Sequence, residues 1–174
     1  VPADSLTRQR TVQTHLLEPL ETDRERQFSA FGRPVLVVEE TDAQWGQATT
    51  ERTPINASAT VENQLPFPLP ITQIEYTIRM NDIVVGAGTT GQQTVIPAEE
   101  SRRITTRAAI DNSKLDEWWV THLRNNENTS MYSDFYLVVA GGGEQFRIDL
   151  DASDYQTVVE TDLFGNKDQY PTGR

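Results

Sequence analysis

Residues 71–86 read ITQIEYTIRMNDIVVG, and this stretch decides the fold class. Every second residue from Ile74 to Met80 is apolar or aromatic, so an extended strand here would have one apolar face and one polar face. Asn81-Asp82 has the residue types of a tight turn, and a second apolar run begins at Ile83. The pattern predicts a β-hairpin in an antiparallel sheet.

Short strand patterns flank this hairpin on both sides. Apolar or alternating runs predict further extended segments, at 35–40, 55–61, 94–98, 104–110, 131–139, 146–150 and 155–161. Three prolines stand within residues 66–70, and proline lacks the N–H that a sheet ladder needs. We therefore expect residues 66–70 to cross between sheets or skirt an edge. About seven antiparallel strands in two packed sheets are predicted.

One helix interrupts the strands. Between Asn112 and Asn126 the spacing of apolar and aromatic residues changes to three and four. The residues with this spacing are Leu115, Trp118, Trp119, His122 and Leu123. The pattern predicts an amphipathic helix over about 112–126 that closes one end of the core, with Asp111 or Asn112 as its N-cap.

Three segments are distinguished by their patterning. Residues 34–163 hold the strand and helix patterns and form the predicted domain, and residues 164–174 form a polar tail. Residues 1–33 are less regular, but Thr11–Leu17 resembles Thr157–Leu163. Residues 1–33 are therefore either a simple N-terminal arm or the remnant of a preceding copy of the same domain.

The charge balance is informative about the surface. The net charge is −11, and Lys occurs only at positions 114 and 167 among 15 basic residues. An acidic, Lys-poor surface is typical of a protein that stays soluble in molar salt, where charges are screened over about 3 Å. An ordinary acidic domain is the alternative. Nucleic-acid partners are disfavoured, because phosphate binding needs clustered basic residues.

Composition and motifs argue against an enzyme. The chain has no Cys, no apolar run long enough to span a membrane, no Gly-x-Ser-x-Gly motif, and only two histidines, His15 and His122. His122 is expected in the core or on the helix surface, and residues 141–143 are expected to form a hairpin tip. We predict no catalytic residues, no cofactor, no metal site and no specific small-molecule ligand.

Carboxylates and asparagines suggest two weaker features. The acidic residues near the helix start and after residue 148 are expected to hold Na⁺ or K⁺ loosely rather than form a dedicated metal site. These residues are Asp111, Asp116, Asp149, Asp151 and Asp154. Asn56 and Asn128 match the N-glycosylation pattern, which matters only if the protein is exported.

Three aromatic residues are possible partner contacts. Neighbouring helix residues point about 100° apart, so Trp118 and Trp119 cannot face the core equally. We expect one to anchor the core and the other to cover its rim. Trp118, Trp119 and Phe67 are the candidates for contact with a partner.

Residues 59–71, ATVENQLPFPLPI, resemble the signature of the water stress and hypersensitive response (WHy) domain of group 2 late embryogenesis abundant proteins. That signature has an Asn-Pro-like turn, a Phe-Pro-Leu-Pro-like crossing and a hairpin ending in Asn-Gly. Here Asn63-Gln64 replaces Asn-Pro, and Asn81-Asp82 replaces Asn-Gly. The order of the later elements is also similar, so the resemblance covers about residues 34–163.

The resemblance implies an immunoglobulin-like or fibronectin-III-like β-sandwich with one helix and no catalytic residues. Within the family, the acidic composition is similar to the haloarchaeal branch. The implied function is desiccation protection, with client proteins or membrane surfaces as partners. The alternative is a cell-envelope adhesion or protein interaction module. A cytoplasmic location and an envelope anchor outside this chain both stay open, as does the oligomeric state.

Overall fold

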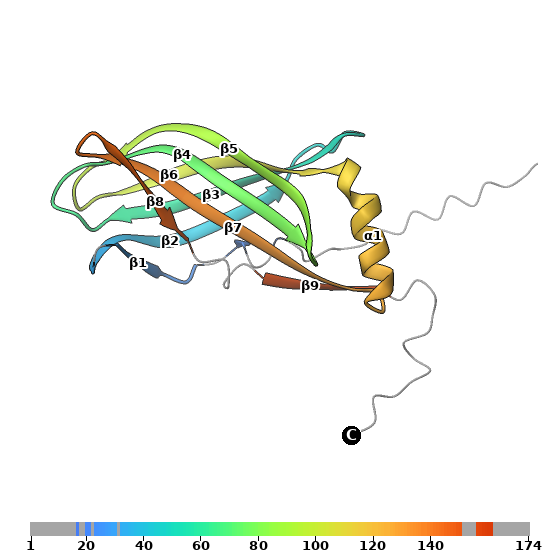
Figure 1. The fold of residues 1–174 in the computed structure, drawn as a ribbon. Helices are drawn as coiled ribbons and strands as arrows, with labels where there is room; N and C mark the ends of the chain where they lie inside the picture. Colours follow the sequence, from blue (N-terminus) through green and yellow to red (C-terminus); the bar gives the residue numbers. More distant parts are fainter. Residues whose placement is uncertain (1–16, 18–19, 22, 31, 151–155, 162–174) are drawn as a thin grey trace, which may run out of the picture.

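The structure is a computed structural model that describes residues 17, 20–21, 23–30, 32–150 and 156–161. In this part of the chain, two antiparallel sheets pack face to face and a short helix lies at one end (Figure 1). The predicted all-β sandwich with one helix is confirmed. The described residues form nine strands rather than about seven.

Each sheet combines consecutive strands with strands that are distant in sequence. Sheet A has the order β1 (Arg26–Ala30), β2 (Arg33–Trp45), β3 (Arg52–Asn63) and β6 (Ser101–Asp111). Sheet B has the order β5 (Ile83–Ile96), β4 (Leu69–Met80), β7 (Asn128–Gly141) and β8 (Glu144–Asp149). β9 (Gln156–Glu160) pairs with the first residues of β7, while β8 pairs with its last residues.

The predicted hairpin is β4–β5, in which Met80 pairs with Ile83. Asn81 occupies the turn with a left-handed φ of 54°, which asparagine tolerates better than most residues. β5 continues without interruption to Ile96, although the sequence pattern suggested a break after Gly86. Gly86 instead permits a close approach between the sheets, because a Cβ at this position would lie 2.2 Å from the carbonyl oxygen of Ala109 in β6.

The proline-rich segment crosses from sheet A to sheet B, as predicted. β3 ends at Asn63, and β4 begins at Leu69. The expectation that no part of residues 66–70 lies in an interior strand is wrong for Leu69 and Pro70, because β4 lies between β5 and β7. Pro70 is tolerated because it pairs only with Val95 of β5, and the pairing with β7 begins one residue later.

The sandwich includes residues upstream of position 34. β1 pairs with β2 from Arg26↔Val38 onwards, so the first hairpin of sheet A starts within residues 1–33. Leu17 and Leu20 are also buried in the core. Residues 11–16 of the suggested repeat and the tail at 164–174 lie outside the described residues.

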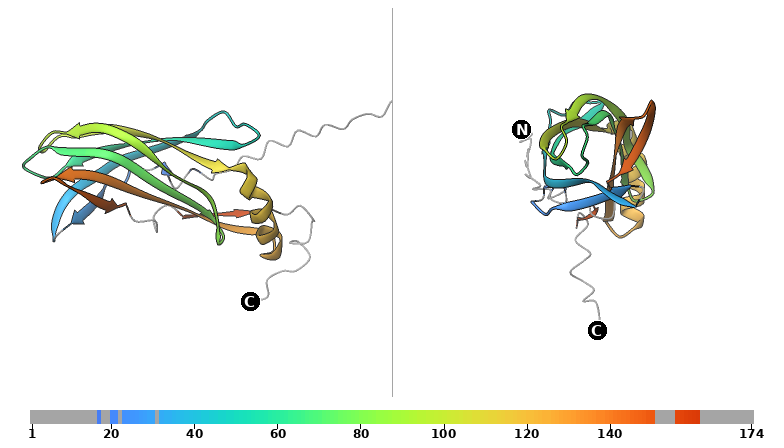
Figure 2. Two further views of the ribbon diagram at one scale, coloured as in Figure 1. Left: turned by 45° about the horizontal axis from the view of Figure 1, so that its top comes forward. Right: turned by 90° about the vertical axis from the view of Figure 1, so that its left-hand side faces the viewer.

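The helix begins with a 3₁₀ turn, η2 (Asn112–Lys114), which leads into α1 (Leu115–Arg124). It lies across one end of the sandwich (Figure 2). Asp111 is the N-cap, as predicted, since its Oδ1 accepts hydrogen bonds from the Ser113 hydroxyl (2.7 Å) and the Ser113 amide (3.0 Å). These two bonds hold the pKa of Asp111 below its ordinary value.

The core lies between the inner faces of the two sheets. Alternate positions along the strands are buried, including Val61 in sheet A and Ile78 in sheet B. Among the described residues, no helix is long and apolar enough to cross a membrane.

Candidate functional site

The three candidate contact residues do not share one surface. Phe67 precedes β4 and is 56% exposed, whereas Trp118 and Trp119 lie on α1, beside the turn that follows β4. They are therefore at opposite ends of the sandwich. Trp118 is half-buried and Trp119 is 37% exposed, so the first anchors the helix and the second covers its rim. A role for these residues in binding a partner stays a prediction.

A chain of buried and half-buried side chains connects α1 with β7 and the end of β9. Trp118 Nε1 donates to Thr129 Oγ1 (2.9 Å), and Thr129 Oγ1 contacts His122 Nδ1 (2.8 Å). His122 Nε2 contacts Thr161 Oγ1 (2.9 Å), which donates to Glu127 Oε2 (2.8 Å). This chain, Trp118–Thr129–His122–Thr161–Glu127, is called the helix-end relay below.

The two end groups of the relay fix the direction of each hydrogen bond, because the Trp118 indole can only donate and the Glu127 carboxylate accepts. The Thr161 hydroxyl donates to Glu127, so its oxygen accepts from His122 Nε2. The Thr129 oxygen accepts from Trp118, which leaves its hydrogen for His122 Nδ1. An imidazole with its hydrogen on Nε2 satisfies every bond in this chain, as a buried polar network requires.

The relay is built to hold structure together rather than to catalyse a reaction. His122 is 0% exposed and Glu127 is 6% exposed, so a substrate cannot reach either group. The stacked ring of Trp119, 5.3 Å from that of His122, covers the imidazole. Glu127 also accepts the Thr161 amide on its backbone oxygen (3.1 Å). The core position predicted for His122 is confirmed, but its partners Thr161 and Glu127 carry no sequence signal.

At the opposite end of the sandwich, the side chain of a single asparagine connects three segments by hydrogen bonds. Asn63 is fully buried, and its Nδ2 donates to the carbonyl oxygens of Phe67 (2.8 Å), Ile96 (3.1 Å) and Pro97 (3.1 Å). Its Oδ1 accepts from the Leu65 amide (3.0 Å). One side chain therefore joins the end of β3, the crossing segment and the end of β5, which explains why the crossing begins with an asparagine.

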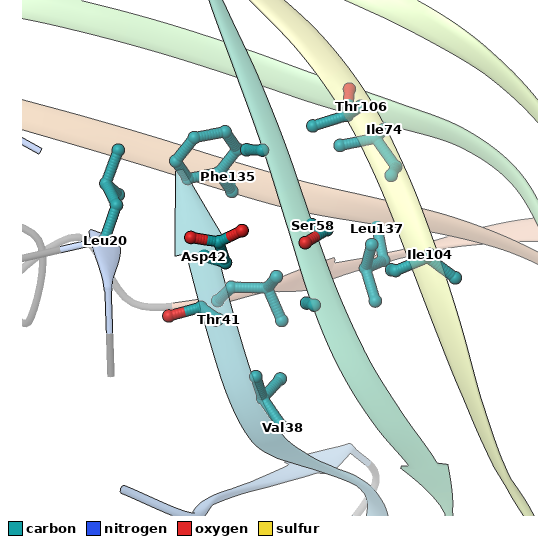
Figure 3. Close-up of a pocket in the computed structure, with 13 residues that line it drawn as sticks. Leu20, Val38, Thr41, Asp42, Ser58, Ile74, Ile104, Thr106, Phe135 and Leu137 are labelled. Atoms are coloured by element: carbon teal, nitrogen blue, oxygen red, sulfur yellow. The ribbon is translucent and has the colours of Figure 1, made fainter. Parts of the chain in front are cut away.

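A cavity of about 60 Å³ lies between these two ends (Figure 3). The β3 residues that line it, Ala57, Ser58 and Ala59, all have small side chains, which leaves space beside Phe135 of sheet B. The hydroxyls of Thr41 and Thr106 line it and are buried without a partner in the described part of the chain. Since one water needs roughly 10–15 Å³, the cavity suits a few waters and not a cofactor.

The acidic residues considered as cation ligands are dispersed. Asp149 lies in β8 opposite Tyr136, while Asp111 and Asp116 lie at the helix start. Among the described residues, no group of three or more His, Asp and Glu side chains could hold a metal ion. Asp151 and Asp154 lie outside the described residues.

Arginines on the outer face of sheet B stack on tyrosines. The guanidinium of Arg147 lies 3.7 Å from the ring centre of Tyr136 and pairs with Glu75 at 2.7 Å. Arg79 repeats the arrangement, 5.5 Å from the ring centre of Tyr132 and 3.2 Å from a carboxylate oxygen of Asp134. A planar guanidinium can stack on an aromatic ring and form an ion pair with a carboxylate at the same time, and the ammonium group of Lys does this less well. These sites therefore favour Arg over Lys.

The family follows from comparison with known proteins. Residues 58–163, more than half of the chain, match the LEA_2 family model, described as late embryogenesis abundant protein. The chain belongs to this family. The matched residues include Asn63 and the whole helix-end relay. A direct comparison with curated protein sequences found no significant match.

Two solved structures resemble this LEA_2 domain. A crystal structure of a protein from Archaeoglobus fulgidus has 27% identity and a TM-score of 0.66, covering 73% of this chain and 99% of that one. The solution structure of an Arabidopsis thaliana protein has 15% identity and a TM-score of 0.51, covering 81% and 92%. The second likeness concerns the fold alone. LEA_2 proteins are generally non-enzymatic, so membership supports a broadly stress-related, non-catalytic role.

Proposed function

We propose that this domain protects other molecules when water activity falls, as a member of the WHy type within the LEA_2 family. The observation that carries the proposal is the family match over residues 58–163. The helix-end relay gives further support, because its His and Glu serve as internal ties and are closed to a substrate. The intact sandwich, and no single reactive residue, is the active agent.

The proposed mechanism is surface hydration. A net charge of −11 with only two lysines leaves an excess of carboxylates, which bind water and cations and keep the protein dispersed at high salt. Arg79 and Arg147 are partly exposed, so salt screens their ion pairs, but each arginine also contacts a tyrosine ring, and that contact depends less on salt. We extend this to a salt-adapted, haloarchaeal-like origin, with client proteins or membrane surfaces as the protected partners.

The test is the recovery of a labile reporter enzyme after drying, at matched salt. One arm contains this protein, and another contains an unrelated β-domain of equal net charge. A third contains the Ile78→Asp variant, which places a carboxylate at a fully buried position and should unfold the sandwich with almost unchanged composition. We expect protection by the native protein only. Equal protection in all three arms would reduce the effect to generic acidity.

The alternative, an envelope adhesion or protein interaction module, needs one contiguous apolar patch. Phe67 and Trp119 are exposed but lie at opposite ends of the sandwich, so the two do not share one patch, and on α1 Val120 is exposed beside Trp119. This argues against a single partner site that contains both Phe67 and Trp119.

A further inference from the structure

The outer face of sheet A holds a groove that surface protection does not require. Its volume is about 490 Å³, within the range of roughly 300–1,000 Å³ that is usual for ligand sites. Residues of β2, β3 and β6 form its floor, and residues of β5 form one wall. The lining is polar, with Ala57 as its one apolar residue.

The sheet register places the polar side chains in rows across the floor. Asn56 of β3 lies between Gln44 of β2 and Arg107 of β6. One row further along, Ser58 lies between Asp42 and Thr105, whose residues also line the groove. Amide, hydroxyl, carboxylate and guanidinium groups are therefore presented at the regular spacing of neighbouring strands.

The wall forms where β5 passes the free edge of β6. Thr90 Oγ1 donates to the carbonyl oxygen of Arg107 (3.3 Å), and the Gln92 amide donates to the carbonyl oxygen of Thr105. These bonds use acceptors on the edge of β6 that an added peptide strand would need. The groove is thus unsuited to a peptide that binds by extending the sheet.

Both arginines of the groove are held in place and keep free donors. Arg107 Nε donates to Asn56 Oδ1 (3.1 Å). Arg103 Nη2 donates to Ser58 Oγ (2.6 Å) and also lies 3.7 Å from Asp42 Oδ2, with which it forms an ion pair. A guanidinium has five N–H donors, so most of them remain for a ligand. The side chains of Gln44 and Thr105 make no hydrogen bond in the described part of the chain, so they too can serve a ligand.

The charge of the groove is opposite to that of the whole protein. Two arginines and a single carboxylate, Asp42, line it, although the chain has 26 acidic and 15 basic residues. A bound group with one negative charge would therefore meet local attraction. A polyanion such as nucleic acid would be repelled by the net charge of −11.

We propose that the groove binds a hydroxyl-rich ligand with one anionic group, the chemistry of an acidic sugar. Amides, hydroxyls and Asp42 can pair with sugar hydroxyls, and Arg103 and Arg107 can hold a carboxylate through charge-assisted bonds. No apolar pocket in the lining offers a peptide side chain an anchor. The site departs from the expectation of no specific small-molecule ligand, and it does not depend on the protection role.

The test is an NMR titration of the full chain with galacturonic acid, a sugar with one carboxylate, at low salt. We expect saturable shifts of backbone amides in β2, β3 and β6. Arg107→Gln should weaken binding about tenfold or more, as expected for loss of a charge-assisted hydrogen bond. Arg102→Gln is the matched control, because Arg102 lies on the same strand, pairs with Glu100 at 3.0 Å and does not line the groove. It should change the affinity less than about twofold.

Several outcomes would overturn the proposal. The first is the absence of a saturable shift with galacturonic acid. The second is an equal loss of affinity in both variants, which would indicate general charge attraction. Equal affinity for maltose would remove the need for an anionic group, and equal affinity for inorganic sulfate would remove the need for hydroxyls. Equal affinity for tetraglutamate would replace the sugar with an acidic peptide. Unchanged melting temperatures of both variants would show that folding is intact.

Discussion

The two ends of the sandwich are held by different means. At the crossing end, the Asn63 amide alone makes four contacts, and all of its partners are backbone atoms. At the helix end, the relay links five side chains through four hydrogen bonds, and His122 stands at its centre. One end therefore depends on a single residue, and the other depends on a shared network.

The difference predicts different responses to substitution. Removal of Asn63 takes a hydrogen-bond partner from four backbone groups at once, of which the Ile96 carbonyl is buried and the others are partly buried. Removal of His122 leaves its neighbours Thr129 and Thr161 with one relay partner each, because each hydroxyl bonds to two groups. The crossing end should be the more fragile, and the helix end should show coupling between residues.

The largest effect is expected for Asn63→Ala. It leaves the Ile96 and Phe67 carbonyl oxygens and the Leu65 amide without their buried partner, which should cost about 3–4 kcal/mol of unfolding free energy. Chemical denaturation at constant salt measures this loss. Asn56→Ala, on the exposed face of the same strand, is the control and should stay within about 0.5 kcal/mol. Similar losses for both variants would refute the role assigned to Asn63.

A smaller loss is expected for His122→Leu. The substitution removes two hydrogen bonds at a fully buried position, but Trp118 still donates to Thr129, and Thr161 still donates to Glu127. We expect a loss of about 2–3 kcal/mol in the same denaturation experiment. Val120→Ala, at an exposed position of the same helix, should change stability by less than about 0.5 kcal/mol. A neutral or stabilising His122→Leu would show that the relay is dispensable.

Coupling within the relay gives a sharper test. Thr129→Val and Thr161→Val both act on bonds to His122, so their effects should be non-additive by about 0.5–1 kcal/mol. A double-mutant cycle measures this term. The cycle that pairs Asn63→Ala with Thr161→Val should be additive within about 0.5 kcal/mol, because the two residues lie at opposite ends. Equal coupling in both cycles would contradict the independence of the ends.

The smallest effect is expected at the start of the helix, for Asp111→Asn. The hydrogen bonds from Ser113 lower the pKa of Asp111, so the charged form stabilises the fold at pH above the ordinary value of 3.8. This contribution is lost as pH falls through the lower pKa of the folded state. The variant should melt slightly below the native protein at neutral pH, and the difference should vanish at about pH 2. Asp116→Asn controls for the change in net charge, and a pH-independent difference would contradict the account.

The structural elements that could be predicted from the sequence are those encoded by residues close together in the chain. Alternation from Ile74 to Met80 and the turn at Asn81 predict the β4–β5 hairpin, because these signals act between near neighbours. The same holds for the proline crossing and for the Asp111 cap. β1 was missed because RQFSA is a short edge strand with little apolar alternation, and its pairing with β2 supplies the order that its own residues do not.

The class of fold, the place of the helix and the excess of acidic residues can be read from the sequence, since these depend on composition and short-range periodicity. Only the tertiary structure decided which distant residues meet. The relay joins Trp118 to Thr161, and the groove joins β2, β3, β5 and β6. These long-range contacts depend on strand register and sheet packing. A shift of one residue in the register of β3 or β6 would turn Asn56 or Arg107 to the opposite face of the sheet. No local pattern encodes that register.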